Sequence, residues 1–502
     1  MQRDEWGTNK AYILASIGAA AGLGNIWRFP YMTYANGGGA FLIPYVIAFL
    51  TIGIPLYLLE LAIGQRQQCS APGAWAKMNK RFEGVGWWGL GVSFFLVLYF
   101  SAIVAWVYDY LYYSLGTSWA GRAEEFFFQD VLSVSSGPAD ISGMSIPVAV
   151  ALVVTWISIY LTLFKGLDLM SKVLKVTVPL PLILLVILMI RGITLDGGID
   201  GIGYYLSPDF SALASPTVWV AAYTQVFFSV GVGMSILIAY ASNRYVHSEI
   251  TRTSIIVSMA EMLISFMAGF VVFSILGYLA LAQGVGIPEV VRGGAELAFV
   301  AFPTAIELMP VATALFGVMF FITLLTLAHS SAISFVKAIS DALTDQWGWS
   351  LKKTSAVTCT VLCAASLFFA TNAGFYWVEI LDHFANNYGV AAVCLVEVIF
   401  IGWASDPEEL RRWISSISYW RLGRWWVFII RYFAPTVITG IIALSAYEDF
   451  VARIPDVMSY PVWTTTLTVL AIVALVPFLS LVVLPRVRRV AGCGYEKSEQ
   501  PP

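Results

Sequence analysis

The strongest constraint on the fold of this chain is a series of long apolar segments that recurs along the whole sequence. A helix needs about 20 mostly apolar residues to cross the hydrocarbon core of a bilayer. Lipid offers no partners to an unpaired backbone, so such segments cross as helices. Segments of this kind predict an all-α, polytopic membrane protein with twelve transmembrane helices, at 10–35, 39–65, 86–115, 146–164, 168–191, 215–242, 250–281, 308–343, 352–371, 376–404, 425–447 and 460–484.

Composition excludes several other classes of protein. Of the 502 residues, 59% are hydrophobic and 12% are charged, whereas soluble domains carry about 25% charged residues. The 28 Lys and Arg are balanced by 31 Asp and Glu, so no basic surface for nucleic acid is expected. The three His form no constellation with Cys or acids, and no nucleotide-binding fingerprint occurs. We therefore expect neither a nucleic-acid partner nor an enzyme.

The distribution of Lys and Arg predicts the orientation in the membrane. If the N-terminus is inside, the inner segments hold 21 of the 28 basic residues and the outer segments hold Arg122, Arg292 and Arg453. Cytoplasmic loops are the ones enriched in Lys and Arg. The pattern predicts a multi-pass protein of the cell (plasma) membrane with both termini cytoplasmic.

Two outer connections are long, at roughly 116–145 and 282–307. The second contains an amphipathic stretch, Ala295 to Ala301, for which a short capping helix and a solvated loop are equally compatible with the sequence. The last two apolar segments could form a homodimer surface or face lipid. Residues 486–502 are predicted to be a polar cytoplasmic tail.

Glycines interrupt the first and the sixth apolar segments. Gly18, Gly22 and Gly24 lie in the first segment, and Gly231 and Gly233 lie in the sixth. Glycine destabilises a helix interior by about 1 kcal/mol relative to Ala. Close helix packing could explain one such cluster. Two clusters at matching positions instead favour two broken helices.

Matching breaks predict an internal symmetry. Residues 1–191 would form one half of five helices and residues 192–404 a second half. Each half has an odd number of crossings, so the second would be inverted relative to the first. Residues 405–485 would add two helices to this 5+5 inverted repeat. Broken helices at matching positions of inverted halves indicate the binding site of a transporter.

Small polar side chains gather near these breaks in otherwise apolar segments. Asn25 and Arg28 lie beside the first break, and Gln225 and Ser229 beside the second. Oxygen ligands of this kind suit hard cations such as sodium. Glu261 stands alone in the seventh segment, and an isolated carboxylate in a membrane helix favours a functional role.

Several motifs carry a resemblance to a known family. The runs Gly22-Leu-Gly-Asn-Ile-Trp-Arg-Phe-Pro30, Asn36-Gly-Gly-Gly-Ala-Phe41, and Gly53-Ile-Pro55 with Glu60 closely resemble the neurotransmitter:sodium symporter family, of bacterial leucine-transporter type. The likeness continues through Gln225–Ser229 and Ser330–Ile333 and covers nearly the whole chain. It implies sodium-coupled uptake of amino acids or related amines by alternating access.

The resemblance implies two sodium sites. The first would use Ala20, Asn25 and Ser229, with Glu261 at a position where the family usually has Asn. The second would use Gly18, Ala21, Leu327, Ser330 and Ser331. Tyr45, Gln225, Ser229 and Ser265 match the residue types around the chloride of chloride-dependent members. We expect Glu261 to supply that negative charge and make transport chloride-independent. A rival interpretation gives Glu261 a role in proton antiport.

The resemblance also implies a substrate site. The third segment usually supplies a Tyr hydroxyl, and the aligned position here is Phe100, with Tyr99 beside it. Gly22 stands where amine-selective members have Asp, which favours a zwitterion. A hydrophobic amino acid is expected, bound by Ala19, Gly22, Gly24, Leu96, Tyr99, Phe100, Phe228, Gly231, Met234, Ser331, Ser334 and Phe335.

Two gates complete the implied mechanism. The outer gate would comprise Arg28, Phe228 and Asp382, and the inner gate Arg3, Trp6 and Asp345. Asn243 replaces the usual Tyr of the inner gate, and Lys337 is also unusual there. The leading hypothesis is a sodium:amino-acid symporter. The alternative is a sensor or scaffold that keeps the fold and binds substrate without transporting it.

Overall fold

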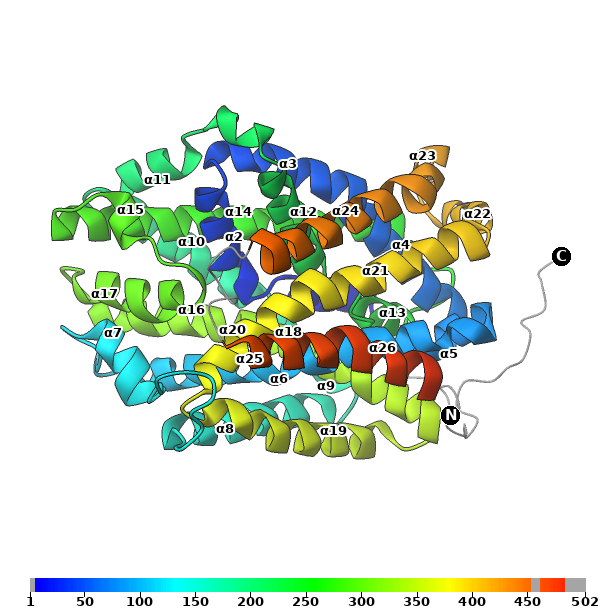
Figure 1. Ribbon diagram of the computed structural model, residues 1–502, viewed down its shortest axis with the longest axis horizontal. Helices are drawn as coiled ribbons and strands as arrows, with labels where there is room; N and C mark the ends of the chain where they lie inside the picture. Colours follow the sequence, from blue (N-terminus) through cyan, green and yellow to red (C-terminus); the bar gives the residue numbers. More distant parts are fainter. Residues whose placement is uncertain (1–4, 453–460, 484–502) are drawn as a thin grey trace.

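The computed structural model describes residues 5–452 and 461–483, and regular structure in these residues is helical (Figure 1). Ten continuous helical segments in the described part are long and apolar enough to cross a membrane. They are Gly39–Gln67, Lys80–Tyr113, Ile146–Leu163, Leu167–Ile193, Thr251–Gln283, Thr313–Trp347, Leu351–Ala370, Gly374–Ala404, Arg424–Ala452 and Trp463–Val482. Each corresponds to one of the twelve predicted segments.

The remaining two predicted segments are divided into shorter helices. The first consists of α1 (Asn9–Ala20), a short 3-10 turn η1 (Leu23–Asn25) and α2 (Arg28–Ala35), and the sixth of α12 (Pro216–Val230) and α13 (Ile236–Ala241). The predicted interruptions are therefore confirmed. Neither broken segment satisfies the criterion for a continuous span, so the count of twelve and the inverted repeat stay predictions.

The continuous segments are built mainly from long α-helices, several extended by π or 3-10 turns. Their bounds are α3 (Leu42–Ala48), α4 (Ile54–Gln67), α6 (Glu83–Tyr113), α8 (Ile146–Leu163), α9 (Leu167–Thr177), α10 (Pro179–Ile193), α14 (Thr251–Gln283), α18 (Thr313–Trp347), α19 (Leu351–Ser366), α20 (Gly374–Phe384), α21 (Ala391–Ile399), α23 (Arg424–Phe428), α24 (Ala434–Ala446), α25 (Val462–Val469) and α26 (Val476–Phe478). Shorter helices connect them, namely α5 (Ala71–Met78), α7 (Ala123–Glu125), α11 (Gly198–Leu206), α15 (Ile287–Val290), α16 (Gly294–Glu296), α17 (Phe302–Glu307) and α22 (Pro407–Ile417).

The broken helices are enclosed by the longest continuous ones. Helix α1 packs against α9, α14 and α18, whereas α13 packs against α4 and α18, and α6 packs against α18. Buried polar side chains, among them Asn25, Ser229, Glu261 and Ser330, lie on these central helices. The centre of the molecule is therefore where the apolar core gives way to polar groups.

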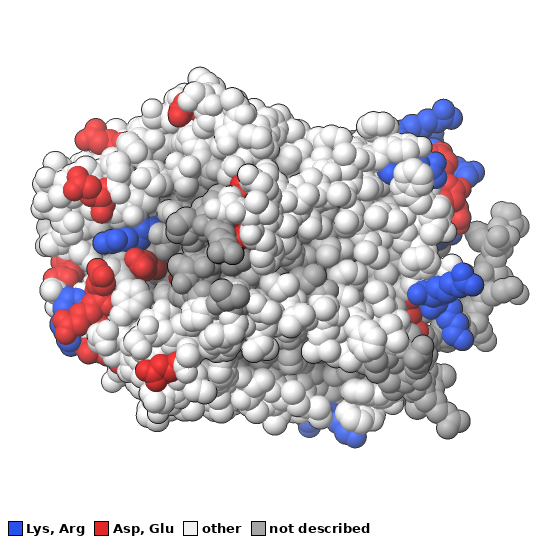
Figure 2. Space-filling model, viewed as in Figure 1, with Lys and Arg blue, Asp and Glu red and all other residues white. Residues whose placement is uncertain are grey.

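Peripheral helices turn apolar side chains outward. On α8, Val150, Val154 and Ile157 are exposed while Leu152 and Trp156 are buried. Large apolar side chains exposed on several turns of one helix suit contact with lipid. On the face seen in Figure 2, Lys and Arg gather at the end that holds α22 and α23, and acidic groups lie mostly at the opposite end. A band nearly free of charge separates the two ends.

The stretch Ala295 to Ala301, predicted to lie in an outer connection, is helical. A π-helix η7 (Leu297–Ala301) joins α16 to α17, and its Phe299 side chain is fully buried. The Phe299 ring lies 5.0 Å from the ring of Tyr110 and 5.1 Å from that of Phe127, centroid to centroid. This packing explains the choice of helix over a solvated loop.

Candidate functional site

The two helix breaks lie at the centre of the candidate site. Helix α1 ends at Ala20, and the Gly22 N–H donates to Asn25 Oδ1 at 3.0 Å instead of continuing the helix. In the second break, Gly231 and Gly233 have φ of +69° and +74°. These left-handed values suit glycine because they crowd a Cβ against the backbone. The second break thus requires glycine, whereas Gly22 in the first break has an extended backbone with φ of −123°.

A small apolar cavity lies between the breaks. Its lining comes from α1, α6, α12, α13, α18 and the two breaks, and comprises Ala19, Ala20, Gly22, Leu23, Leu96, Tyr99, Phe100, Phe228, Gly231, Met234, Ile236, Ser331 and Phe335. Ten of these belong to the predicted substrate residues. Leu23 and Ile236 were missed, since each is an apolar residue with no feature that distinguishes it from its neighbours.

Two predicted substrate residues lie outside this lining. Gly24 is covered by Phe228, because a Cβ added at Gly24 would lie 2.2 Å from the Phe228 ring. Ser334 is fully buried, and its hydroxyl is 2.7 Å from Tyr240 Oη and donates to the Ser330 carbonyl. These contacts give Gly24 and Ser334 packing roles beside the cavity.

Tyr99 and Phe100 both line the cavity. The Tyr99 hydroxyl donates to Asp382 Oδ1 at 2.7 Å, and Asn386 Nδ2 donates to the same oxygen at 3.0 Å. Phe100 instead packs near Phe335, with ring centroids 6.4 Å apart. Asn386 was missed, and its position one helical turn after Asp382 is the only signal that could have indicated it.

Glu261 lies in a cluster of polar side chains at the first break. Asn25 Nδ2 donates to Glu261 Oε1 at 2.9 Å and to Ser265 Oγ at 2.8 Å. Ser265 Oγ donates to Glu261 Oε1 at 3.0 Å, and Tyr45 Oη to Oε2 at 3.4 Å. Glu261 is fully buried. Its contacts are neutral donors, so the carboxylate has hydrogen bonds and no basic side chain beside it in the described chain.

This cluster contains the kinds of oxygen ligand that a sodium ion prefers. Ser229 lies close to Glu261 and accepts from Gln225 Nε2 at 3.1 Å. The Gln225 carbonyl oxygen Oε1 is buried without a hydrogen-bond partner. Carboxylate, amide and hydroxyl oxygens are ligands for hard cations. Ala20 lines the cavity and is the last residue of α1, directly before the first break.

A second group of oxygens lies between α1 and α18. Ser330 Oγ donates to the Leu327 carbonyl at 2.8 Å, and Ser331 Oγ is 3.3 Å from the same carbonyl. Ser331 Oγ also donates to the Gly18 carbonyl at 3.5 Å. Ala21 follows the last residue of α1. Hydroxyl and carbonyl oxygens from two helices converge here, and this donor set also fits sodium.

The predicted outer-gate residues lie beside Phe228 and Tyr99, which line the cavity. The Arg28 guanidinium lies over the Phe228 ring, 5.3 Å from its centroid, and its buried Nη1 has no hydrogen-bond partner. Asp382 accepts hydrogen bonds from Tyr99 and Asn386. Both gate residues are described, and no ion pair joins Arg28 to Asp382 in this conformation.

The predicted inner gate is only partly described. Arg3 lies outside the described residues. Trp6 Nε1 donates to the Tyr240 carbonyl at 3.0 Å, and Asp345 Oδ2 accepts from the Ser70 N–H at 2.8 Å. Lys337 and Asp341, one turn apart on α18, form an almost fully buried ion pair. Asn243 Nδ2 donates to Asp341 Oδ2 at 3.2 Å. Asn243 and Lys337, the two residues that depart from the family pattern, therefore both contact Asp341.

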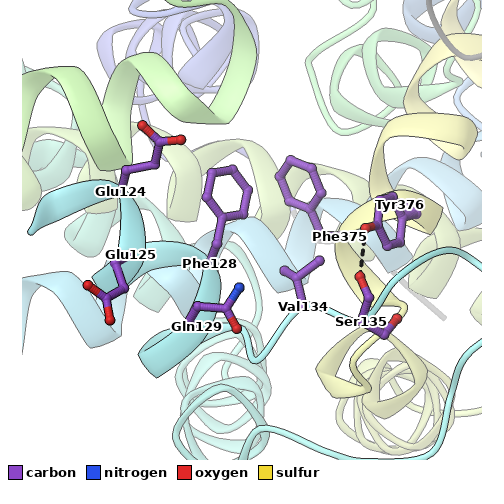
Figure 3. Close-up of a pocket in the computed structure, with 8 residues that line it drawn as sticks. All are labelled: Glu124, Glu125, Phe128, Gln129, Val134, Ser135, Phe375 and Tyr376. Atoms are coloured by element: carbon purple, nitrogen blue, oxygen red, sulfur yellow. Dashed lines mark hydrogen bonds between the residues drawn. The ribbon is translucent and has the colours of Figure 1, made fainter.

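A larger hollow, of about 620 Å³, lies at the surface of the molecule (Figure 3). The carboxylates of Glu124 and Glu125 point in different directions, and Tyr376 Oη donates to the Ser135 carbonyl at 2.7 Å. Its polar groups do not converge on a common point. We therefore place the candidate site at the helix breaks and not in this hollow.

Comparison with known proteins finds similarity over nearly the whole chain. The sodium:neurotransmitter symporter family matches residues 3–121 and 117–490. A sodium-dependent transporter of Methanocaldococcus jannaschii is 37% identical over 98% of this chain and 99% of its own length. The sodium-dependent dopamine transporter of Bos taurus is 33% identical over 93% of this chain and 72% of its own. The human sodium- and chloride-dependent creatine transporter 1 is 32% identical over 92% and 80%.

Proposed function

This chain belongs to the sodium:neurotransmitter symporter family, and we propose that it imports a small hydrophobic amino acid or a related zwitterion together with sodium. It is a sodium-dependent membrane transporter and not an enzyme. The observation that carries the proposal is the apolar cavity between the two broken helices. Broken helices leave peptide groups free to bind ions and substrate, and they allow each helix half to move separately. Alternating access then exposes the cavity to one side at a time.

The substrate class follows from the lining. Apart from Tyr99 and Ser331, the side chains that face the cavity are apolar, and none is ionisable at neutral pH as Asp or Lys would be. A substrate with its own carboxylate and ammonium can pair these charges with peptide groups of the breaks and with ions. The cavity volume is about 30 Å³, which is the space of about one water molecule. Phe228, Phe100 and Phe335 must therefore move to admit a substrate.

Two sodium ions are proposed to couple to this substrate. One would bind among Asn25, Ser229, Glu261 and the Ala20 carbonyl, and the other among Ser330, Ser331 and the carbonyls of Gly18, Ala21 and Leu327. Sodium entering down its gradient supplies the work, because moving one charge through 100 mV releases about 2.3 kcal/mol. Glu261 is proposed to provide the negative charge that chloride provides in chloride-dependent relatives.

The two gates would close opposite sides of the protein in the two states of alternating access. Arg28 has a free buried nitrogen above Phe228, and we propose that it approaches Asp382 when the outer side closes. Trp6 and Asp345, with Arg3, would hold the inner side closed. The protein would lie in the plasma membrane with its termini in the cytoplasm.

Uptake into proteoliposomes tests the proposal. A panel of labelled amino acids and amines is added under an inward sodium gradient, with an equal potassium gradient as the control. Sodium-dependent accumulation of one apolar amino acid above equilibrium is expected. Accumulation of a monoamine instead would contradict the substrate class. Saturable binding without accumulation would favour the sensor hypothesis.

A further inference from the structure

Two carboxyl groups that the proposed mechanism does not use lie beside the second break. Glu60 on α4 and Glu397 on α21 are each at most 1% exposed. Glu60 Oε1 accepts a hydrogen bond from the Gly233 N–H at 2.6 Å. Cys394, one turn before Glu397, lies close to both carboxyl groups, and its sulfur would be 2.7 Å from a Cβ added at Gly233. Glu60 therefore contacts Gly233 directly, and Cys394 adjoins Gly233 and both carboxyl groups.

Neither carboxyl group is neutralised by a basic side chain. Among the described residues, no Lys, Arg or His forms an ion pair with Glu60 or Glu397. Glu60 Oε2 and Glu397 Oε2 are both buried without a hydrogen-bond partner. Two carboxylates ionised together in a buried site would repel each other and lose their hydration. At least one of the two groups therefore requires a proton or another cation.

Further unpartnered oxygens lead away from Glu60. Tyr57 lies one turn before Glu60 on α4, and Tyr12 and Ser16 lie one turn apart on α1, so each pair shares a helix face. Their hydroxyl oxygens are fully buried, and none of the three makes a hydrogen bond of standard geometry. Tyr57 is close enough to Tyr12, Ser16 and Glu60 to interact with each of them. Buried polar groups without protein partners commonly bind water or an ion.

This line of oxygens ends at Arg244, which lies shortly after the end of α13. The Arg244 guanidinium lies over the Tyr12 ring, 4.2 Å from its centroid, and its Nη2 donates to Asn9 Oδ1 at 2.9 Å. The groups therefore run from the end of α13 towards Gly233. Water held along them would connect the proposed cytoplasmic side with the two carboxyl groups.

We propose that Glu60, Glu397 and the Tyr57 hydroxyl form a third, buried site for one monovalent cation, either sodium or a proton, reached through water held by Tyr12 and Ser16. Oxygen donors and a net negative charge are the chemistry that such a cation requires. Because Gly233 donates to Glu60, any movement of the second break changes the site. The site thereby adds one cation to the coupling, and in this respect the inference rests on the proposed function.

Cation counting on the purified full-length protein tests the site. The variants Glu60→Gln and Glu397→Gln remove one charge each and keep an amide oxygen in place. Asp109→Asn is the matched control. Asp109 also has a buried oxygen without a partner, but it lies near the C-terminal end of α6. Bound ²²Na⁺ is measured at saturation, and the midpoint of thermal unfolding is measured in sodium-free buffer as a function of pH.

A sodium site predicts one sodium fewer per molecule in E60Q and E397Q than in the unaltered protein and D109N. A proton site predicts unchanged sodium numbers, together with loss of the stabilisation that a lower pH gives to the unaltered protein. Equal sodium numbers and equal pH dependence in all four proteins would overturn the inference. If E60Q and E397Q do not fold, Tyr57→Phe keeps both charges and is expected to weaken cation binding about 3–10-fold, a loss comparable to one hydrogen bond.

These readouts do not depend on transport. If the unaltered protein binds sodium without accumulating any substrate, the proposed function fails and the count still decides on the third site. If it transports normally and neither the sodium counts nor the pH dependence of unfolding differ among the variants, only the third site fails.

Discussion

At the scale of single residues, Tyr99 connects the cavity with the proposed outer gate. Its ring lines the cavity and its hydroxyl donates to Asp382 at 2.7 Å. In Tyr99→Phe, the loss of one hydrogen bond, about 0.5–1.5 kcal/mol, is expected to raise the KM for substrate about 2–10-fold. Tyr108→Phe is the control, because the Tyr108 hydroxyl bonds to Ser158 instead. Uptake kinetics that change equally in both variants would contradict a gate role.

Glu261 offers a test of the proposed independence from chloride. Replacement of chloride by gluconate is expected to leave uptake by the unaltered protein unchanged. Glu261→Gln removes the negative charge among Asn25, Ser265 and Tyr45. This variant is expected to lose most of its uptake in gluconate and regain it as chloride is added. Glu261→Asp keeps the charge and should need no chloride. Loss of uptake by the unaltered protein in gluconate would disprove this role.

Sequence could predict which residues are chemically unusual but not which atoms they contact. An isolated carboxylate in an apolar segment already marked Glu261 as functional. Its bonds to Asn25 and Tyr45 depend on how three segments pack, which no local pattern contains. Ser334 is a second example. The resemblance implied that it binds substrate, yet its hydroxyl lies 2.7 Å from the Tyr240 hydroxyl on another segment.

At the scale of helices, the second break can be tested by two similar substitutions. Both Gly231 and Gly233 have positive φ. A Cβ at Gly231 would meet nothing within 4 Å, whereas one at Gly233 would lie 2.7 Å from Cys394 Sγ and 2.9 Å from the Val390 carbonyl oxygen. Gly231→Ala should cost about 1–2 kcal/mol of backbone strain. Gly233→Ala should cost clearly more and abolish transport. Thermal unfolding midpoints and uptake measure both, and equal losses would refute the packing argument.

The buried pair on α18 makes a different prediction for the inner side. Lys337 and Asp341 are 2% and 8% exposed. Removing one partner of a buried ion pair typically costs about 3–5 kcal/mol, whereas an apolar replacement of both is often tolerated. Lys337→Met is therefore expected to destabilise the protein strongly, and the double variant with Asp341→Leu should recover most of the loss. Thermal unfolding of the detergent-solubilised variants would measure these changes in stability. A double variant as unstable as the single one would argue for a role of Asp341 beyond the pair.

Helix existence was easier to predict than helix continuity or contacts. Long apolar segments indicate crossing helices because lipid leaves the backbone no alternative, and glycine clusters indicated both breaks. The stretch Ala295 to Ala301 was ambiguous because seven residues carry too little periodicity. Contacts of Phe299 with Tyr110 and Phe127, which lie far away in sequence, determine its structure.

At the scale of the whole molecule, charge and apolar surface together define how the protein sits in a membrane. Basic groups gather at the end of the molecule that carries α22, and acids mostly at the other end, on the face seen in Figure 2. Helices α8 and α10 carry exposed apolar side chains, such as Ile157 and Ile183. A membrane potential and the positive-inside preference act on the whole chain, so a few substitutions in the site should not alter the orientation.

This argument predicts the side on which each loop is found. Alkaline phosphatase is active only outside the cytoplasm, and it can be inserted after Gly137, where the surrounding space is open, or after the exposed Arg421. The first insertion should be active and the second inactive. Green fluorescent protein fused to the C-terminus should fluoresce, because it folds in the cytoplasm. Immunoblots of each fusion control for expression. Activity after Arg421 would mean that the basic end faces outward, and the assignments of outer and inner gates would then have to be exchanged.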